Sequence, residues 1–305
     1  MLITGDNQGN IKSLKFVMKN ENCKFILKNL TEANGHTINQ INSFKKNEIF
    51  FGSVDGMIGV FDKKSNKSIS NRNFSDTELN TYHVFENGNI LAFYNNYMRT
   101  WEKKNDLYFF SKNKIIIGKN FKYVLANQSE KFILTASFFE NQIYLWSIFE
   151  NKLVLGGKNE LKEFIVSLKG ASEDLFTIGT HSGSVYIYSI YGELIRSIKK
   201  NYFSKNFKRP DLQKSAAWLG KNIIFSGKLS GRIEIVDLRC HKSASFLSGH
   251  SSEVSNISIS SSTESFPFLA SSDALGNLKI WDIRGKEEIF FQKKFTSKIT
   301  SLSFL

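Results

Sequence analysis

The stretch from Lys199 to Lys214 holds the residues whose types and spacing most directly suggest chemistry. Basic side chains outnumber acidic ones six to one in it, and aromatic residues are interleaved with them. The basic residues are Lys199, Lys200, Lys205, Lys208, Arg209 and Lys214, and the aromatic residues are Tyr202, Phe203 and Phe207. Because cationic side chains neutralise phosphates and aromatic rings stack on unpaired bases, the stretch predicts a contact site for RNA or another acidic partner. The alternative interpretation is a solvated surface loop.

Positive charge also extends beyond this stretch. The 305 residues carry 41 basic and 28 acidic side chains, a formal net charge of +13. A second basic run, expected in an equivalent connection on the same face, comprises Lys112, Lys114, Lys119 and Lys122, whereas Lys63, Lys64, Lys67 and Arg72 are expected on the opposite side. A polyanionic partner such as ribosomal RNA would explain the charge. Nucleotide bias toward lysine codons is the alternative explanation, since only seven of the basic residues are arginine.

The nucleophiles, acids and bases that catalysis needs do not converge in the sequence. The five histidines are scattered at His36, His83, His181, His241 and His250. Neither a phosphate-binding glycine loop nor a nucleophile elbow nor a zinc-protease helix is present. The two cysteines, Cys23 and Cys240, lack the spacing of metal ligands or of a redox pair. We therefore expect no enzyme, no metal, no cofactor and no small-molecule substrate.

Membrane insertion and secretion are not expected either. No run of apolar residues approaches the length of a membrane-spanning segment. The N-terminus enters an apolar strand directly, without the basic and then apolar residues of a leader. The interpretation is a protein that neither contacts membranes nor is secreted.

The elements that must position these residues repeat seven times. Each copy is an apolar strand, a turn of small residues and a second strand that ends on an aromatic or aliphatic residue. The turns lie at Gly9, Gly56, Asn96, Asn141, Gly183, Gly231 and Gly276, with spacings of 47, 40, 45, 42, 48 and 45 residues. Such spacings are typical of β-propeller blades with four strands each. The sequence thus predicts an all-β, seven-bladed propeller that forms one domain over residues 1–305.

The two ends of the chain are expected to share the first blade. The predicted blades are 1–30 with 298–305, then 36–73, 80–112, 121–156, 161–200, 212–248 and 250–296. Blade one lacks its innermost strand, and Lys298 to Leu305 is a spare alternating strand. We expect this strand to complete blade one, with Ile299, Ser301 and Ser303 on one face. Closing the ring in this way removes an exposed sheet edge.

The last repeat resembles the WD-repeat family. It reads Gly249-His250, then Leu269 to Asp273, and closes on Lys279-Ile280-Trp281-Asp282. The second repeat keeps Gly35-His36, Asp55-Gly56 and Phe61-Asp62. The resemblance implies a structural hydrogen-bond network formed by His36, Ser53, Asp55, His250, Ser271, Asp273 and Trp281, with the histidines buried. It also implies that Trp101 and Trp146 are core residues, while Trp218 stays unassigned.

Short landmarks along the chain are similar to those of nucleolar WD-repeat factors of large ribosomal subunit assembly. They include Gly9 to Lys12, Lys208-Arg209-Pro210, Gly231 to Arg239 and Phe295 to Leu302. This resemblance implies a non-catalytic scaffold in the nucleolus that binds proteins and RNA of the pre-60S particle. The competing interpretation is a general protein-interaction subunit of a chromatin, mRNA-export or ubiquitin-ligase complex, in the nucleus or cytoplasm.

Overall fold

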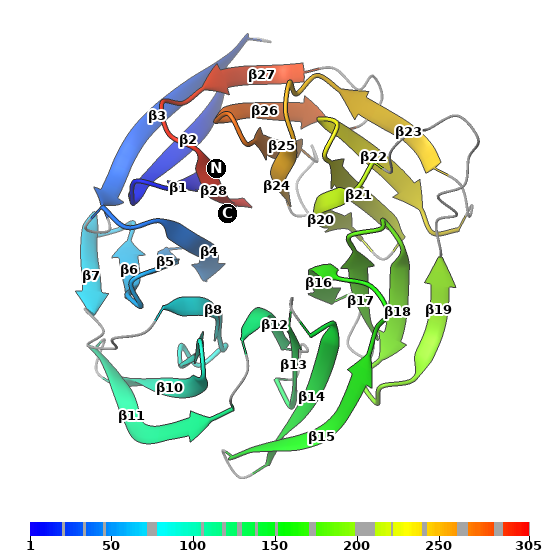
Figure 1. The fold of residues 1–305 in the computed structure, drawn as a ribbon. Coiled ribbons are helices and arrows are strands. Elements are labelled where there is room, and N and C mark those ends of the chain that lie inside the picture. The colour runs from blue at the N-terminus through cyan, green and yellow to red at the C-terminus, as the bar shows by residue number, and fades with distance from the viewer. Residues whose placement is uncertain are drawn as a thin grey trace. The chain divides into compact units, whose positions relative to one another are not determined.

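Seven four-stranded antiparallel sheets make up the part of the chain that the computed structural model describes. The described residues are 1–19, 22–32, 35–44, 47–71, 78–104, 107–117, 120–126, 130–137, 140–149, 152–170, 175–198, 211–220, 222–239, 243–260, 268–283 and 289–304. They form 28 strands and no α-helix. The architecture is a seven-bladed β-propeller (Figure 1), which confirms the predicted fold class.

The strands fall into two compact units, Met1–Ile115 with Ser255–Leu305 and Ile116–Val254. Four sheets belong to the first unit. In sheet order they are β28 (Ile299–Phe304), β1 (Leu2–Asp6), β2 (Asn10–Lys19) and β3 (Asn22–Glu32); β4 (Ile38–Phe44), β5 (Glu48–Ser53), β6 (Ile58–Asp62) and β7 (Lys67–Asn71); β8 (Leu79–Val84), β9 (Ile90–Tyr94), β10 (Tyr97–Lys104) and β11 (Leu107–Ile116); and β24 (Val254–Ile259), β25 (Phe268–Asp273), β26 (Asn277–Asp282) and β27 (Ile289–Lys294).

Three sheets belong to the second unit. They are β12 (Phe121–Ala126), β13 (Phe132–Ser137), β14 (Gln142–Phe149) and β15 (Lys152–Glu160); β16 (Ile165–Gly170), β17 (Leu175–Thr180), β18 (Val185–Ser189) and β19 (Leu194–Ile198); and β20 (Gln213–Leu219), β21 (Ile223–Lys228), β22 (Arg232–Asp237) and β23 (Ser243–Ser248). The division into units leaves the assignment of one domain over the whole chain a prediction.

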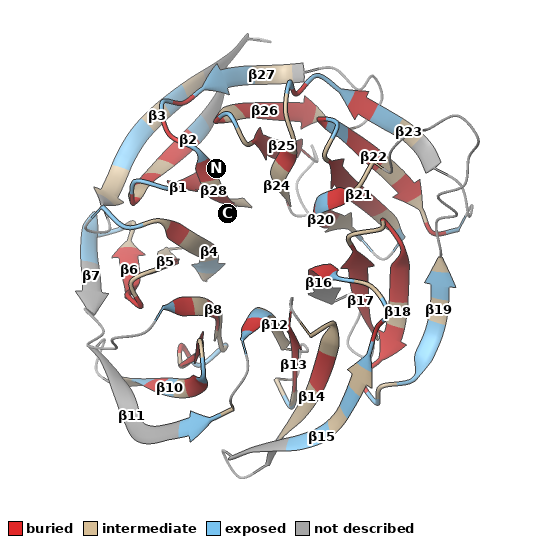
Figure 2. Ribbon diagram, viewed as in Figure 1, coloured by how far each residue is buried: buried red, intermediate tan, exposed pale blue. Residues whose placement is uncertain are grey.

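The second strand of each sheet is covered on both faces. Every residue of β9 and β25 is buried, and so is every residue but the first of β5, β13, β17 and β21 (Figure 2). These strands are rich in Phe, Ile and Leu with little polar alternation, as expected for strands buried on both faces. By contrast, three residues of the fourth strand β19 are exposed, since it lies at the outer edge of its sheet.

The spare strand at the end of the chain completes the first blade, as predicted. β28 pairs antiparallel with β1, with Leu2 opposite Phe304 and Thr4 opposite Leu302. Ile299 and Ser301 are buried, and Ser301 Oγ accepts a hydrogen bond of 3.0 Å from the backbone N–H of Ile41 in β4. The closing strand is therefore bonded to β1 on one side and touches the next blade on the other.

Neighbouring blades approach closely at a glycine near the end of the second strand. A Cβ added to Gly52 would lie 2.6 Å from the Leu79 side chain of the next blade, and one added to Gly179 would lie 2.8 Å from Gln213 Nε2. Since real Cβ atoms do not approach so closely, the absence of a side chain allows the first strand of the next blade to pack there.

Candidate functional site

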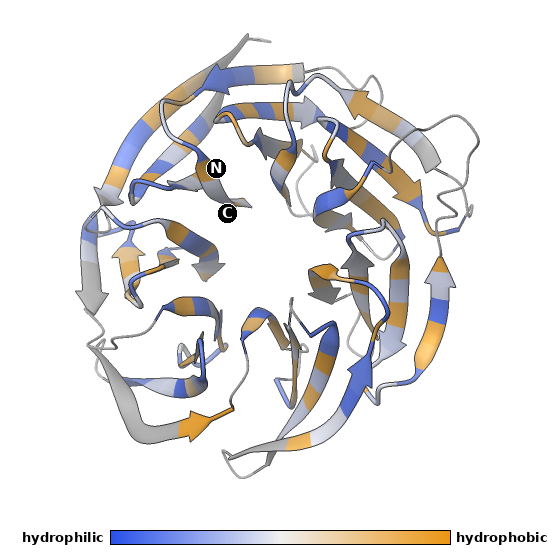
Figure 3. Cartoon of the chain, in the orientation of Figure 1, coloured by the Kyte–Doolittle hydropathy of each residue, from blue (hydrophilic) through white to orange (hydrophobic). Residues whose placement is uncertain are grey.

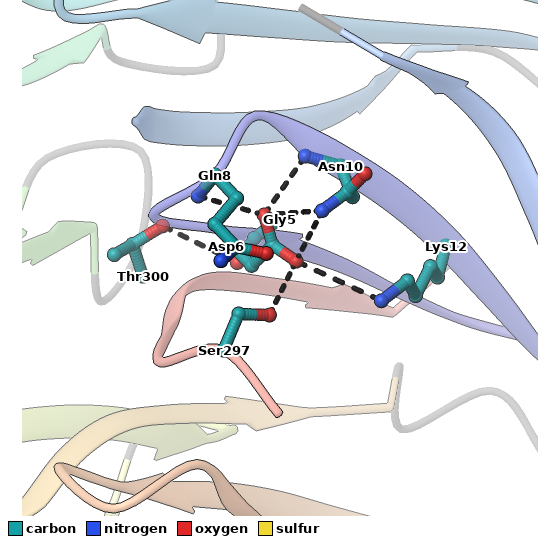
Figure 4. A network of polar contacts seen from close by, with 7 residues as sticks. All are labelled: Gly5, Asp6, Gln8, Asn10, Lys12, Ser297 and Thr300. Atoms are coloured by element: carbon teal, nitrogen blue, oxygen red, sulfur yellow. Dashed lines mark hydrogen bonds and ion pairs between the residues drawn. The ribbon is translucent and has the colours of Figure 1, made fainter. Parts of the chain in front are cut away.

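The turns between second and third strands carry a polar network that is built twice in the same way. Asp6 Oδ1 accepts hydrogen bonds from the N–H groups of Gln8 and Asn10 at 3.0 and 2.8 Å (Figure 4). Asp273 Oδ1 accepts from Leu275 and Asn277 at 3.0 and 2.9 Å. Each aspartate stands three residues before a turn glycine and four before an asparagine. The two turns are therefore copies of one local design.

Ser297 ties the first of these turns to the closing strand. Its Oγ donates to Asp6 Oδ2 at 2.6 Å, and Lys12 Nζ lies 3.7 Å from the same oxygen. Burial alone would raise the pKa of Asp6, but the hydrogen bonds from Ser297, Asn10 and Gln8 outweigh it, so the pKa is lowered. Asp6 is thus ionised in the folded protein and fully engaged in structural contacts.

The network implied by the WD resemblance takes different forms in the two repeats. Trp281 Nε1 donates to Ser271 Oγ at 2.8 Å, and both residues are buried. In the second repeat, Ser53 Oγ donates to Asp55, while His36 Nε2 lies 3.9 Å from the same carboxylate.

The expectation that His36 is buried was wrong. Its side chain is 55% exposed, because Asp55 stands in the open turn, one residue before Gly56, rather than at the strand end that Asp273 occupies. His250 is buried, as expected.

The second unit fills the equivalent positions with other chemistry. Glu163 accepts hydrogen bonds from the hydroxyls of Thr180, Ser182, Ser184 and Tyr186. In the next sheet, Lys228 stands where the first sheet has an aspartate, and Glu234 stands where it has a lysine. Lys228 Nζ lies 3.0 Å from Glu234 Oε2, and both side chains are buried. The contacts differ, but in each case polar groups that are partly or fully buried pair with one another, which favours a structural role over a catalytic one.

A different repeated feature, a β-bulge, positions residues for binding. In five sheets the first strand has one extra residue opposite the end of the second strand, and the β28–β1 pair has the same irregularity. The extra residues are Asn39, Asn80, Lys122, Val166, Lys214 and Thr300. Such a bulge leaves one residue out of the ladder and turns its side chain to a new direction. Two of these positions therefore present a lysine.

Lys122 and Lys214 flank sheet β16–β19. The first strand β16 packs against both β12 and β20, which carry these two lysines. The N–H of Gln213 donates to the carbonyl of His181 at 2.9 Å, so Lys214 follows directly on a bond to the turn of the middle sheet. Both lysines are exposed. We refer to Lys122 and Lys214 as the bulge lysines.

The charge of Lys214 acts on two ionisable groups of the neighbouring sheets. Desolvation, and then the positive charge of Lys214, lower the pKa of Lys122 and of His181. His181 is therefore mainly neutral at pH 7. Glu253 Oε2 lies 3.7 Å from Lys214 Nζ, a partly exposed pair of the kind that contributes little energy.

Most of the predicted basic stretch lies outside the described residues. Lys199, Lys200, Tyr202, Phe203, Lys205, Phe207, Lys208 and Arg209 are in this group, and Lys214 alone of the predicted contact residues is described. The stretch does connect β19 to β20, as expected. Lys112 and Lys114 were expected in a connection but lie in β11, because this strand continues to Ile116. Sequence reasoning missed the pairing of Lys122 with Lys214, since a bulge depends on two strands.

The remaining singled-out residues have structural surroundings. Trp101 is buried in the core of the first unit, and Trp146 Nε1 donates to Thr135 Oγ1 at 3.0 Å. Trp218 packs beside Val185, Ile224 and Val236. Among the described residues, no three His, Cys, Asp or Glu side chains converge as metal ligands do, and no helix is long and apolar enough to cross a membrane.

Comparison with known proteins shows the fold of the chain but no family. No family model matches the sequence, and no curated protein matches it. Among solved structures, the chain is similar to the crystal structure of the computationally designed Ika8 protein, with 15% identity and a TM-score of 0.66. The match covers 99% of this chain and 87% of the designed one. The likeness is one of fold alone, and the seven blades are read from the seven sheets of this chain.

Proposed function

We propose that the protein is a non-catalytic scaffold that binds RNA through the bulge lysines and the adjoining stretch 199–214. The observation that carries the proposal is the presence of two exposed lysines at the same bulge position of sheets β12–β15 and β20–β23, on either side of β16. After desolvation, the positive charge of Lys214 lowers the pKa of Lys122. Two exposed positive charges on neighbouring sheets favour an anionic ligand, which would add to the weak pairing of Lys214 with Glu253.

RNA is proposed over other polyanions because the stretch that leads into Lys214 also contains Tyr202, Phe203 and Phe207. Aromatic residues among lysines suit unpaired bases next to phosphates. The landmarks shared with nucleolar assembly factors add the cellular setting that we propose, which is a large-subunit ribosome precursor. Protein partners within that assembly are part of the same proposal.

Salt-dependent binding of a fluorescent single-stranded oligouridine tests the RNA proposal. Replacing both bulge lysines by glutamate should weaken binding and lower the slope of log affinity against log salt by about 1.4, at roughly 0.7 for each lost phosphate contact. Replacing Lys199, Lys200, Lys205 and Lys208 by glutamate should lower it by about 3.

The matched control reverses Lys64 and Lys67, two exposed lysines at the turn from β6 to β7, and should leave the slope unchanged. An unchanged slope in the bulge-lysine variant would contradict the proposal. The cellular setting is tested separately by sedimentation of the tagged protein. Co-migration with large-subunit precursors supports it, and recovery only in a small complex free of RNA rejects it.

A further inference from the structure

We infer that three exposed lysines at the end of β27 and just after it form a docking surface for an acidic protein segment that carries an apolar side chain. They are Lys293, Lys294 and Lys298, and we refer to them as the lysine surface. These residues belong to the first unit, whereas the bulge lysines belong to the second. The inference therefore concerns a second binding surface and does not depend on the proposed RNA site.

Backbone contacts hold the lysine surface in place. Lys294 ends β27, which is paired with β26. The carbonyl of Lys298 accepts a hydrogen bond of 3.0 Å from the N–H of Asn7, in the turn of the first blade. Between these two points, the N–H of Phe295 donates to the carbonyl of Gly276 at 2.9 Å. Because the backbone is fixed in this way, little of its conformational entropy is lost when a partner binds.

Two aspartates lie in the turns that contact the lysine surface, and each acts on a lysine of its own. Asp6 Oδ2 lies 3.7 Å from Lys12 Nζ (Figure 4). Asp273 is fully buried; burial lowers the pKa of Lys279, and the charge of Asp273 acts in the opposite direction. No ion pair joins the lysine surface to a carboxylate in the part of the chain that the structure describes. Its positive charge is therefore available to an acidic partner.

An aromatic ring lies beneath the lysines rather than on the surface. The ammonium nitrogens of Lys12 and Lys293 lie 5.4 and 5.9 Å from the centre of the Phe295 ring, a geometry that favours cation–π attraction. Phe295 is only 8% exposed. Because this ring is covered, it does not offer a base an open face for stacking, which favours a protein ligand over single-stranded nucleic acid.

An exposed leucine adjoins the lysine surface. Leu275, in the turn between β25 and β26, is 59% exposed. The next residue, Gly276, packs against the segment after β27, since a Cβ added to it would lie 2.8 Å from the carbonyl oxygen of Ser297. Figure 3 shows β27 as hydrophilic at its end, where the lysines begin. An apolar side chain beside positive charge suits a segment with carboxylates around one apolar residue.

The test uses two fluorescein-labelled peptides, one of aspartates around a central leucine and one with serine in place of that leucine. Replacing Lys293, Lys294 and Lys298 together by glutamine removes the charge but keeps most of each aliphatic stem, including the one beside Phe295. This variant should bind both peptides about threefold to a hundredfold more weakly, the range for three exposed ion pairs. Its binding should also depend less on salt concentration.

A second variant, Leu275→Ser, tests the apolar part of the surface. It should weaken binding of the leucine peptide by about tenfold and leave binding of the serine peptide unchanged. Leu194→Ser is the matched control, because Leu194 is a similarly exposed leucine (52%) on the outer strand β19. Replacing Lys15, Lys64 and Lys67 by glutamine controls for net charge, since these are three other exposed lysines of the first unit.

The outcomes separate an acidic protein segment from other anionic partners. Unchanged peptide binding in the triple-lysine variant would overturn the inference, and so would an equal loss in its lysine control. A matching loss of binding to oligouridine or to phosphatidylserine vesicles would reassign the surface to nucleic acid or to lipid and overturn the acidic segment. Loss of peptide binding with retained oligouridine binding supports the inference and leaves the bulge-lysine proposal to its own test. Because every substituted side chain is exposed, all melting temperatures should match that of the wild type.

Discussion

The carboxylates of Asp6 and Asp273 hold two turns of the same construction. In both, one side-chain oxygen accepts from the N–H groups two and four residues later, and the second oxygen accepts from an asparagine amide. Charge-assisted hydrogen bonds of this kind are among the stronger polar contacts in proteins. At the residue scale, a buried aspartate fixes a tight turn beside the next blade.

Replacing Asp6 by Asn should destabilise the protein in a pH-dependent way. The folded-state pKa of Asp6 lies below its ordinary value of 3.8, so the ionised form stabilises the fold above that pH, and this contribution is lost as pH falls through the lowered pKa. At pH 7 the variant should lose about 2 kcal/mol of unfolding free energy. Urea unfolding should show this difference at pH 7 and a smaller one near pH 3.

The exposed Glu78→Gln variant serves as the control for charge removal and should match the wild type at both pH values. A difference between Asp6→Asn and the wild type that is equal at both pH values would show that the carboxylate does not titrate with folding.

At the scale of elements, the close approach of adjacent blades depends on small residues at the end of the second strand. In the second unit, a Cβ on Gly179 would lie 2.4 Å from Ser167 Oγ in β16, and this hydroxyl has no hydrogen-bond partner among the described residues. The steric cost of a larger side chain at Gly179 and the cost of the Ser167 hydroxyl thus arise at the same place. A double-mutant cycle can separate these two contributions to the free energy of unfolding.

Gly179→Ala should destabilise the protein by about 1–3 kcal/mol, the usual cost of overpacking. Ser167→Ala alone should be neutral or slightly stabilising, because it removes a buried hydroxyl without a partner. The double variant should recover part of the loss, since Ser167 Oγ is gone while Gln213 Nε2 still lies 2.8 Å from the added Cβ. Denaturant unfolding of the four proteins measures the coupling. Gly157→Ala, where nothing lies within 4 Å of the added Cβ, is the matched control.

Strands could be predicted from the sequence, but the bulges could not. Alternation placed the closing strand at 298–305, where the structure has β28, because this signal is local. A bulge is a property of pairing between two strands, so nothing in the order of residues around Lys122 distinguishes it from Lys119. The exposure of His36 was missed for a related reason, since the similarity of Asp55 to Asp273 hid a shift of two residues relative to the turn glycine.

For the whole molecule, the closing strand should be essential wherever it is placed in the chain. Removing residues 297–305 deletes β28, the Ser297–Asp6 bond and the buried Ile299. We expect the truncated protein to be insoluble or to melt far below the full chain. A soluble truncation with an unshifted melting temperature would refute the role of the closing strand.

A circular permutant distinguishes loss of the strand from loss of the chain end. Because Phe304 lies opposite Leu2 in an antiparallel pair, a short glycine linker from residue 305 to Met1 would form an ordinary hairpin. With a new terminus between β26 and β27, this permutant should fold and melt near the wild-type temperature.

The antiparallel pairing of β1 with β28 also determines how the first blade responds to force. Leu2 and Phe304 stand opposite each other at the same end of the paired strands. A load that pulls these two residues apart therefore acts across the ladder rather than along it, and breaks the hydrogen bonds one after another. The β1–β28 pair therefore opens from the end where the load is applied. The contact that completes the fold at rest is also the first to open under this tension.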